Sequence, residues 1–386
     1  MSSKIRTWPF PFCDKLKICQ EMNDAAEIVG GPISGGGGSL KRKRPLKIEI
    51  PAVLSEIPVD VFKESDDPVC FADSDSGVGV YSLKGKKKFM EDSYKVFASA
   101  NGDKRFFGVY DGHGGSKAAA FVKENLHLKI FEMLESISEN KEKEAACKAG
   151  YLKTDEEFLK QGLDSGACCV TALIDGREMV VSNLGDCRAV LCMGGGSAEA
   201  LTTDHRPTRE EERRRIEDKG GYVEIHRGTW RVHGTLAVSR SIGDAHLKDW
   251  VMAEPDTKVV CLDPDMKYLV LASDGLWEEV SNEEAVGVVM QSCSSGKKQR
   301  MSHPSGRRMA SIRGGDGSPP AKSRRISVAK QTKKMKARFP DNENRALNER
   351  RLLAACKKLA DLAVDRGSLD DITVMIIDLN HYNMNP

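Results

Sequence analysis

The chain has 386 residues, 40% of them hydrophobic, which suffices for one large domain with appendages or for two ordinary domains. Charge is nearly balanced overall, yet residues 297–338 hold fourteen Lys or Arg and one Asp. There is no run of about 18 apolar residues, no apolar secretory region at the N-terminus and no Cys-x-x-Cys among the eleven cysteines. These features exclude a membrane span and a disulfide scaffold, and they predict a reduced protein of the cytoplasm, the nucleus or both.

The first 75 residues are predicted to form a disordered leader that carries a flexible Gly- and Ser-rich linker at 30–39. The folded region is expected to begin near Gly77 and to extend over residues 77–380. It is interrupted at 294–344 by a basic stretch rich in Ser, Gly and Pro, which we expect to be a disordered insertion.

Strand and helix patterns alternate along the folded region. Strands are predicted at 105–110, 167–174, 178–184, 187–193, 267–273 and 371–379. Helices are predicted at 116–134, at 207–221 with Pro207 near the first position, at 281–291 after a Ser281 and Glu284 capping box, and at 346–367 before Gly367. Short spacing favours an antiparallel meander for the three strands between 167 and 193, and strand 371–379 is too apolar for an edge. The pattern predicts an α+β fold, a sandwich of two antiparallel β-sheets flanked by α-helices.

Acidic residues recur at the ends of these apolar runs. They are Glu91, Asp92, Asp111, Asp186, Asp244, Asp274, Asp370 and Asp371. If the strand ends share one rim of the sandwich, the carboxylates form a cluster that needs counter-charge, and oxygen ligands suit Mg²⁺ or Mn²⁺. Gly112 and Gly275 each follow one of these acids, which lets the backbone turn sharply or a carbonyl approach a metal. A single Asp-Gly pair is also the usual dipeptide of a simple turn, but the whole set favours a metal site.

Eight motifs in this sequence resemble, in the same order, those of the metal-dependent type 2C protein serine/threonine phosphatases, in the style of the plant branch. They are MEDSYKVF, FFGVYDGHGGSKAA, SGACCVTALI, VSNLGDCRAVL, LTTDHRPTREEERRRIEDKGG, GTLAVSRSIGD, LVLASDGLWEEVSNEEAV and GSLDDITVMII. The resemblance covers residues 77–380 apart from the insertion. It implies a centre of two Mg²⁺ or Mn²⁺ ions at one rim of the sandwich, with a weaker third ion.

The resemblance also implies roles for individual residues. Asp111 matches the carboxylate that bridges both ions, and Gly112 matches a carbonyl ligand. The remaining matched metal positions are Asp274 and Asp370 for one ion, Glu91 with its neighbour Asp92 for the other, and Asp186 with Glu278 for the third. Glu278 stands where the family usually has Asp, and Asp371 stands where it usually has Asn, so either Asp370 or Asp371 could be the ligand, and Asp370 is preferred.

Catalysis in such a centre needs no covalent nucleophile, because two ions can activate a bridging water for in-line attack on phosphorus. His113 matches the histidine that protonates the leaving serine or threonine oxygen, although a histidine in a turn can also be merely structural. Lys87 stands at the position of the family's phosphate-binding arginine, and it keeps the charge but lacks the bidentate fork.

The leader contains a basic cluster followed by two alternate apolar residues, which resembles the docking motif for a mitogen-activated protein kinase in one plant branch. The residues are Lys41, Arg42, Lys43, Arg44, Leu46 and Ile48, within the range 41–50. Basic side chains can meet an acidic patch while alternate apolar side chains enter pockets. The same letters also fit a nuclear-import signal or a solvated run of charge.

These observations predict a monomeric phosphatase that hydrolyses phosphoserine and phosphothreonine in proteins and acts on a mitogen-activated protein kinase or a related stress-signalling protein. One alternative is a catalytically weak, kinase-binding scaffold of the same fold. Another is a phosphohydrolase for small molecules or nucleic acid. We do not expect membrane binding, because there is no long apolar run. We do not expect nucleic-acid binding, because aromatic residues do not interleave with the basic residues of the insertion.

Overall fold

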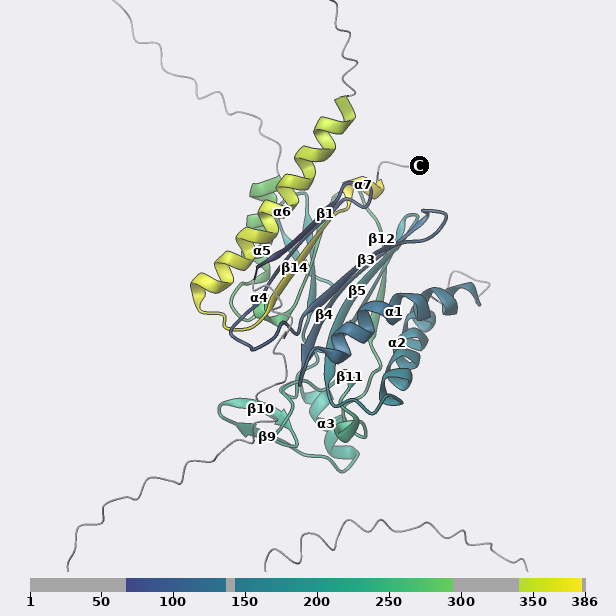
Figure 1. Ribbon diagram of the computed structural model, residues 1–386, viewed down its shortest axis with the longest axis vertical. Coiled ribbons are helices and arrows are strands. Elements are labelled where there is room, and N and C mark those ends of the chain that lie inside the picture. Colours follow the sequence, from purple (N-terminus) through teal and green to yellow (C-terminus); the bar gives the residue numbers. More distant parts are fainter. Residues whose placement is uncertain (1–66, 137–142, 294–339, 384–386) are drawn as a thin grey trace, which may run out of the picture. The chain divides into compact units, whose positions relative to one another are not determined.

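Two antiparallel six-stranded β-sheets face each other in the computed structural model, which describes residues 67–136, 143–293 and 340–383 (Figure 1). The first sheet has the order β1 (Val69–Asp73), β2 (Val78–Leu83), β14 (Ile372–Asp378), β13 (Met266–Ala272), β7 (Arg188–Met193) and β8 (Ala198–Ala200). The second has the order β12 (Asp256–Cys261), β6 (Glu178–Leu184), β5 (Gly166–Asp175), β4 (Lys104–His113) and β3 (Ser93–Ala98), and β11 (Ile242–Gly243) pairs with β5.

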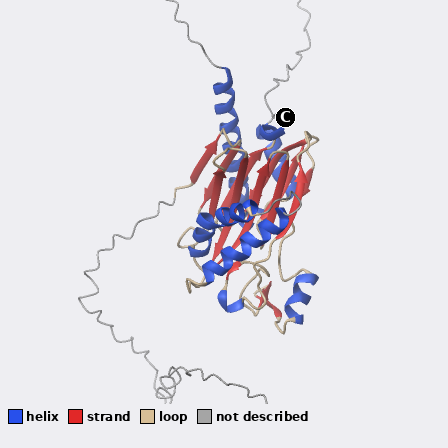
Figure 2. Cartoon of the chain, turned by 90° about the vertical axis from the view of Figure 1, so that its right-hand side faces the viewer, coloured by secondary structure: helices blue, strands red, loops and turns tan. Residues whose placement is uncertain are grey.

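Helices cover the outer face of each sheet, as Figure 2 shows with strands in red and helices in blue. The second sheet carries α1 (Lys117–Glu135) and α2 (Lys143–Leu159). The first sheet carries α4 (Asp274–Trp277), α5 (Asn282–Cys293) and α6 (Pro340–Arg366), and α7 (Asn380–Asn383) follows β14. Three apolar clusters result, one between the sheets and one under each helical layer. The predicted α+β sandwich is therefore confirmed.

A small lobe adjoins one end of the sandwich. It contains α3 (Glu210–Asp218), the hairpin of β9 (Val223–His226) and β10 (Thr229–Val232), and the 3₁₀ turn Ala245–Leu247 (Figure 1). Its own apolar cluster is limited to a few side chains, among them Ile216, Val232 and Val251.

The strand expected to lie inside the sheet does so, because β14 pairs with β2 on one side and β13 on the other and is buried along its length. The predicted meander at 167–193 is wrong in its last strand. β5 and β6 pair, but β7 pairs with β13 and β8 in the opposite sheet. Short spacing cannot distinguish a hairpin from a crossing between sheets, since all three strands are buried along most of their length.

The crossing occurs at Gly185, whose φ of +97° favours glycine. A Cβ there would lie 2.3 Å from Cys168 Sγ, so the position has no space for a side chain. His205 fastens the same crossing, because its Nδ1 accepts a hydrogen bond from the Gly185 N–H at 3.1 Å and its Nε2 donates to Asp256 Oδ2 at 2.9 Å. The crossing thereby fixes Asp186 at the rim of the sandwich.

Several predicted boundaries also move. β1 lies inside the range 1–75 that was predicted to be a disordered leader, and it pairs with β2. α6 begins at Pro340, within the range predicted as the insertion, and α3 begins at Glu210, so Pro207 precedes the helix. The capping box is confirmed by reciprocal bonds between Ser281 and Glu284. Helix α2 was not predicted from the sequence. Among the described residues, no helix is long and apolar enough to cross a membrane.

One buried carboxylate on α3 fastens the segment that leads to the site. Glu212 accepts hydrogen bonds from Arg240 (2.6 Å), Ser239 Oγ (2.7 Å) and Arg215 (2.9 Å). Burial raises the pKa of Glu212, but these hydrogen bonds and charges more than offset it and lower the pKa from 4.5 to about 2. Glu212 therefore ties the small lobe to Ser239 and Arg240, a few residues before Asp244.

We expect Glu212→Gln to lower the free energy of unfolding at pH 7 by about 3–5 kcal/mol, because it removes one partner of a buried ion-pair network. Since the folded pKa lies below the unfolded one, the ionised group stabilises the fold above pH 4.5, and this contribution is lost as the pH falls towards about 2. Urea unfolding should therefore show that the difference in free energy of unfolding between wild type and Glu212→Gln becomes smaller as the pH falls from 4.5 towards about 2. The control Glu210→Gln removes an exposed pair with Arg214 and should change stability by less than about 1 kcal/mol.

Candidate metal centre

Three carboxylates that are distant in the sequence meet at one rim of the sandwich. Asp111 lies near the end of β4, Asp186 at the crossing after β6, and Asp274 at the first position of α4 after β13. One carboxylate oxygen from each lies within 4.8 Å of the others, and Asp111 and Asp186 are buried, with 8% and 4% exposure. Both sheets therefore contribute to the cluster.

The three carboxylates of the cluster carry like charge, which the chain compensates only in part. Burial, followed by the neighbouring carboxylates, raises the pKa of Asp111 and of Asp274 well above the usual range. Burial also raises the pKa of Asp186, although the Arg206 guanidinium opposes it. Because only oxygen donors converge here and desolvation penalises each charge, the site fits a hard divalent cation.

Asp92 gives a further indication of cation binding. It is 7% exposed, and its Oδ2 accepts a hydrogen bond from Ser273 Oγ at 2.7 Å. Its other oxygen, Oδ1, is buried and has no hydrogen-bond partner among the described residues. Burial raises the pKa of Asp92 to about 7. A buried carboxylate oxygen without a donor is accounted for if a cation binds beside it.

Two further predicted ligands are joined by a lysine. Lys87 Nζ lies 2.6 Å from Asp370 Oδ1 and 3.2 Å from Glu91 Oε2. Burial lowers the pKa of Lys87, but the hydrogen bond and charge of Asp370 outweigh this and raise it, so the side chain stays an ammonium ion. The structure thus places Asp370, Glu91 and Lys87 together on one wall of the site.

Asp371 has a different environment from Asp370. Its Oδ1 accepts a hydrogen bond from the Gly85 N–H at 2.7 Å, and its Oδ2 accepts one from the Glu91 N–H at 2.8 Å. Both oxygens therefore hold the loop that carries Lys87, whereas Asp370 lines the cavity.

The glycines predicted beside the acids lie where side chains cannot fit. A Cβ on Gly112 would lie 2.5 Å from the carbonyl oxygen of Glu91, and one on Gly275 would lie 2.2 Å from that of Asp371. The close backbone approach at both positions brings Glu91 to Asp111 and Asp370 to Asp274.

Arg206 adds an unpredicted positive charge to the cluster. Its Nη2 lies 3.1 Å from Asp186 Oδ2, 3.6 Å from Asp274 Oδ2 and 3.1 Å from Glu278 Oε1. Glu278 is half exposed and contacts the cluster through this arginine. The charged residues of the loop at 201–209 follow no periodic pattern, so the sequence could not predict that Arg206 lies beside the cluster.

A cavity of about 360 Å³ opens over the carboxylates. Its lining includes the residues already described and two from the small lobe, and comprises Lys87, Asp111, His113, Cys168, Asp186, Arg206, Thr229, Arg231, Leu236, Ala237, Val238, Asp274, Glu278 and Asp370. The β9–β10 hairpin therefore forms part of its wall, which the sequence reasoning did not anticipate.

His113 ends β4 beside this cavity. Its Nε2 lies 2.7 Å from Asp244 Oδ2, and Asp244 is buried. Because Asp244 follows an apolar run, the sequence predicted that it would join the carboxylate cluster. In the structure its carboxylate binds His113 instead.

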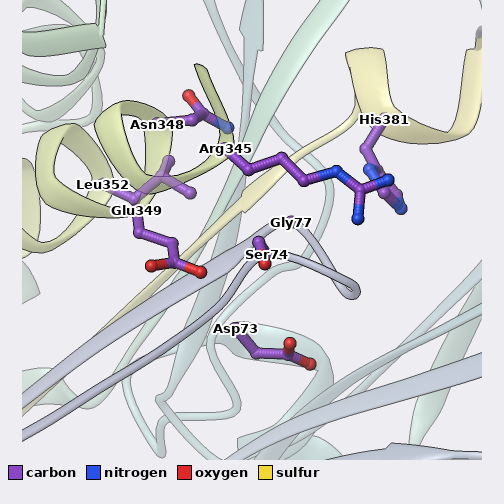
Figure 3. Close-up of a pocket in the computed structure, with 8 residues that line it drawn as sticks. All are labelled: Asp73, Ser74, Gly77, Arg345, Asn348, Glu349, Leu352 and His381. Carbon is purple, nitrogen blue, oxygen red and sulfur yellow. The ribbon is translucent and has the colours of Figure 1, made fainter. Parts of the chain in front are cut away.

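A second cavity, of about 210 Å³, lies at the opposite end of β2 from the Lys87 loop (Figure 3). It is lined by the β1–β2 turn, α6 and His381. Arg345 contacts Asp75 at 3.2 Å, and Asn348 donates to Asp378 at 2.9 Å. Arg345 and Asn348 thus bind neighbouring elements, and the lining shares no residue with the carboxylate site.

Comparison with known proteins identifies the family. The family model described as protein phosphatase 2C matches residues 76–310. A "Probable protein phosphatase 2C 14" of Arabidopsis thaliana is 51% identical over 329 residues, which cover 80% of this chain and 73% of the relative. "Probable protein phosphatase 2C 2" of the same plant is 41% identical over 379 residues, covering 96% and 84%. The chain therefore belongs to the protein phosphatase 2C family, and it is a metal-dependent protein phosphatase.

Solved structures share the fold at low sequence identity. A Caenorhabditis elegans protein titled a sex determining protein aligns with a TM-score of 0.60 and 21% identity, covering 79% of this chain and 66% of that one. A serine-threonine phosphatase 2C from Toxoplasma gondii aligns with a TM-score of 0.58 and 23% identity, covering 81% and 98%.

Replacing one carboxylate should separate metal binding from folding. We expect Asp111→Asn to raise the melting temperature of the metal-free protein, because it removes one of three mutually repelling buried charges. Mn²⁺ should stabilise the wild-type protein by about 2.7 kcal/mol per site at a hundredfold excess over Kd, and the variant far less. Thermal unfolding with Mn²⁺ and with chelator measures both effects. The control Asp218→Asn, on the exposed end of α3, should behave as wild type. If Mn²⁺ stabilises Asp111→Asn as much as wild type, Asp111 is not a metal ligand.

Proposed function

We propose that this chain hydrolyses phosphoserine and phosphothreonine in proteins with a water nucleophile. The observation that carries the proposal is the buried cluster of Asp111, Asp186 and Asp274 at the floor of a cavity that also presents His113 and Lys87. The carboxylate cluster would bind cations, and the side chains of His113 and Lys87 would contact a phosphate ester bound above them.

A covalent cysteine mechanism is not supported by the cysteine in this cavity. Cys168 is buried, and burial followed by the charges of Asp186 and Asp111 raises the pKa of its thiol well above the usual range. The thiol therefore stays protonated, and a protonated thiol is a weak nucleophile.

The divalent ions are proposed to lie among residues of both walls. Two ions would be held by Asp111, the Gly112 carbonyl, Asp274, Asp370 and the pair Glu91 and Asp92. Asp186 and Glu278 would hold a weaker third ion in competition with Arg206, which contacts both. When bound, Mg²⁺ or Mn²⁺ supplies Lewis-acid chemistry, neutralising phosphate charge and lowering the pKa of water.

The chain's own side chains would then orient the ester. Lys87 presents an ammonium group to a phosphate oxygen, and it is held in place by Asp370 and Glu91. His113 lies at the cavity wall, where it would protonate the serine or threonine oxygen as the phosphorus–oxygen bond breaks.

Asp111→Asn should lower kcat on a phosphothreonine peptide by at least about 100-fold, because the central carboxylate of the site is lost. Chelator should abolish wild-type turnover and Mn²⁺ should restore it, while Asp218→Asn keeps full activity. Equal wild-type rates on a nucleotide and on the peptide would favour a general phosphohydrolase instead. Absence of turnover on any ester would favour a kinase-binding scaffold.

We further propose a mitogen-activated protein kinase, docked through the leader, as the substrate. The supporting segment lies outside the described residues and comprises Lys41, Arg42, Lys43, Arg44, Leu46 and Ile48. Four consecutive basic residues followed by two alternate apolar ones suit an acidic patch beside apolar pockets on a kinase. The same cluster is proposed to permit nuclear import, so the enzyme would be found in the cytoplasm, the nucleus or both.

Replacing the four basic residues and both apolar residues with Ala should abolish kinase capture, since both halves of the recognition are removed. The variant should keep its activity on p-nitrophenyl phosphate. A matched control neutralises Lys333, Lys334, Lys336 and Arg338, which carry equal charge in a different part of the chain. Capture measured by pull-down should survive in this control. Loss of binding in both variants would indicate attraction by charge alone, and retention in both would exclude the docking proposal.

A further inference from the structure

We propose that Asp244 is a positioning residue for the reaction: it binds Nε2 of His113 and turns Nδ1 towards the leaving oxygen of the substrate. The inference rests on the proposed role of His113 as proton donor, and it concerns a residue that the sequence analysis grouped with the carboxylates of the metal site.

The contact is short and largely shielded from water. His113 Nε2 and Asp244 Oδ2 are 2.7 Å apart, with side-chain exposures of 25% and 6%. Burial raises the pKa of Asp244, but the hydrogen bond and charge of His113 and the hydroxyl of Ser241 outweigh it and lower the pKa below its usual value. An ionised carboxylate can only accept hydrogen bonds, so Nε2 of His113 carries the hydrogen. Nδ1 is then the ring nitrogen left to carry a second one.

The backbone around Asp244 is arranged to present its carboxylate. Asp244 adopts a left-handed conformation, with φ and ψ both 50°, which is uncommon for a residue other than glycine. Its N–H donates to the Ser165 carbonyl at 3.1 Å, and Ser241 Oγ donates to the same Oδ2 that binds His113, at 2.5 Å. Backbone strain of this kind persists when surrounding contacts determine it, and it is common at functional sites.

A second buried carboxylate anchors the turn from behind. Asp155 on α2 accepts hydrogen bonds from the Gly243 N–H at 2.8 Å and from Lys248 Nζ at 2.9 Å. The residues on both sides of Asp244 are thereby tied to the helical layer. The carboxylate of Asp244 extends from this anchored turn to His113 on β4.

The strand between the two partners has no side chain at the point where they meet. Gly166 on β5 pairs with His113 on β4 and with Gly243 on β11. A Cβ on Gly166 would lie 2.1 Å from Asp244 Oδ2 and 2.2 Å from His113 Nε2. The histidine and the aspartate therefore meet across the space that any other residue would fill.

The proposed step balances in atoms and charge. The oxygen of water forms the new bond to phosphorus, and the bond from phosphorus to the serine or threonine oxygen breaks with its electron pair on that oxygen. The proton on His113 Nδ1 moves to this oxygen and yields the free hydroxyl. His113 is then neutral with its hydrogen still on Nε2 and bound to Asp244, and it regains a proton from solvent equal to the one released by water.

Substrates with different leaving groups test the proposal. A phosphothreonine peptide releases an alkoxide that needs a proton, whereas p-nitrophenyl phosphate releases a phenolate that is stable without one. Asp244→Asn should lower kcat on the peptide by on the order of 100-fold and change kcat on p-nitrophenyl phosphate by less than about threefold. Retained p-nitrophenyl phosphate activity also reports that the variant folds and binds metal.

The reference variant His113→Gln separates this proposal from the proposed function. It should show the same substrate split, and the double variant should be no slower on the peptide than either single one, because the two residues act as a unit. If His113→Gln shows no split, its role as proton donor fails. If it shows the split and Asp244→Asn does not, the positioning role of Asp244 fails.

A milder variant covers the case in which Asp244→Asn does not fold. Ser241→Ala removes the second hydrogen bond to Asp244 Oδ2 and leaves the contact with His113 in place. It should produce a smaller split in the same direction, about three- to tenfold. An equal loss on both substrates, or a loss on neither, would overturn the proposal.

Discussion

Mutual repulsion among buried carboxylates is the constraint on which the rest of this structure depends. Asp111, Asp186 and Asp274 share a space in which each raises the free energy of ionising the others. The fold tolerates the cluster because it recruits positive charge, from Arg206 and Lys87 within the chain and from divalent ions in the family's chemistry. Arg206 and Lys87 relieve this repulsion in part, and a bound divalent ion would relieve it further, which links metal binding to stability.

The sandwich makes this convergence possible. Each sheet contributes at least one carboxylate, and the crossing at Gly185 carries the chain from the second sheet to the first where Asp186 is needed. The apolar cluster between the sheets holds the rims in register, so a short loop suffices to place each charge. The same arrangement accounts for glycine at 112, 166 and 275, where another backbone or a functional side chain lies too close for a Cβ.

Much of this was accessible from the sequence, because strand-end acids and apolar periodicity follow simple geometric rules. The rules predicted the sandwich, the interior strand β14 and the convergence of Asp111 with Asp274. They failed where the outcome depended on turn conformation: β7 entered the other sheet, and a left-handed backbone turned Asp244 to His113. Arg206 was missed because a long side chain from an irregular loop has no pattern, and the roles of the individual ligands stay predictions.

The two walls of the cavity are anchored to the fold in different ways. On one side, the carboxylate of Asp371 accepts hydrogen bonds from both ends of the loop that carries Lys87. This joins the loop to β14, a strand inside the sheet. On the other side, Thr229 and Arg231 come from a two-stranded ribbon with a small apolar cluster, an arrangement of little independent stability. With the proposed role of Lys87, the phosphoryl end of a substrate would meet the wall that is anchored in the sheet, and the polypeptide around it would meet the ribbon. Selectivity for the protein target can consequently diverge through the ribbon without disturbing the chemistry.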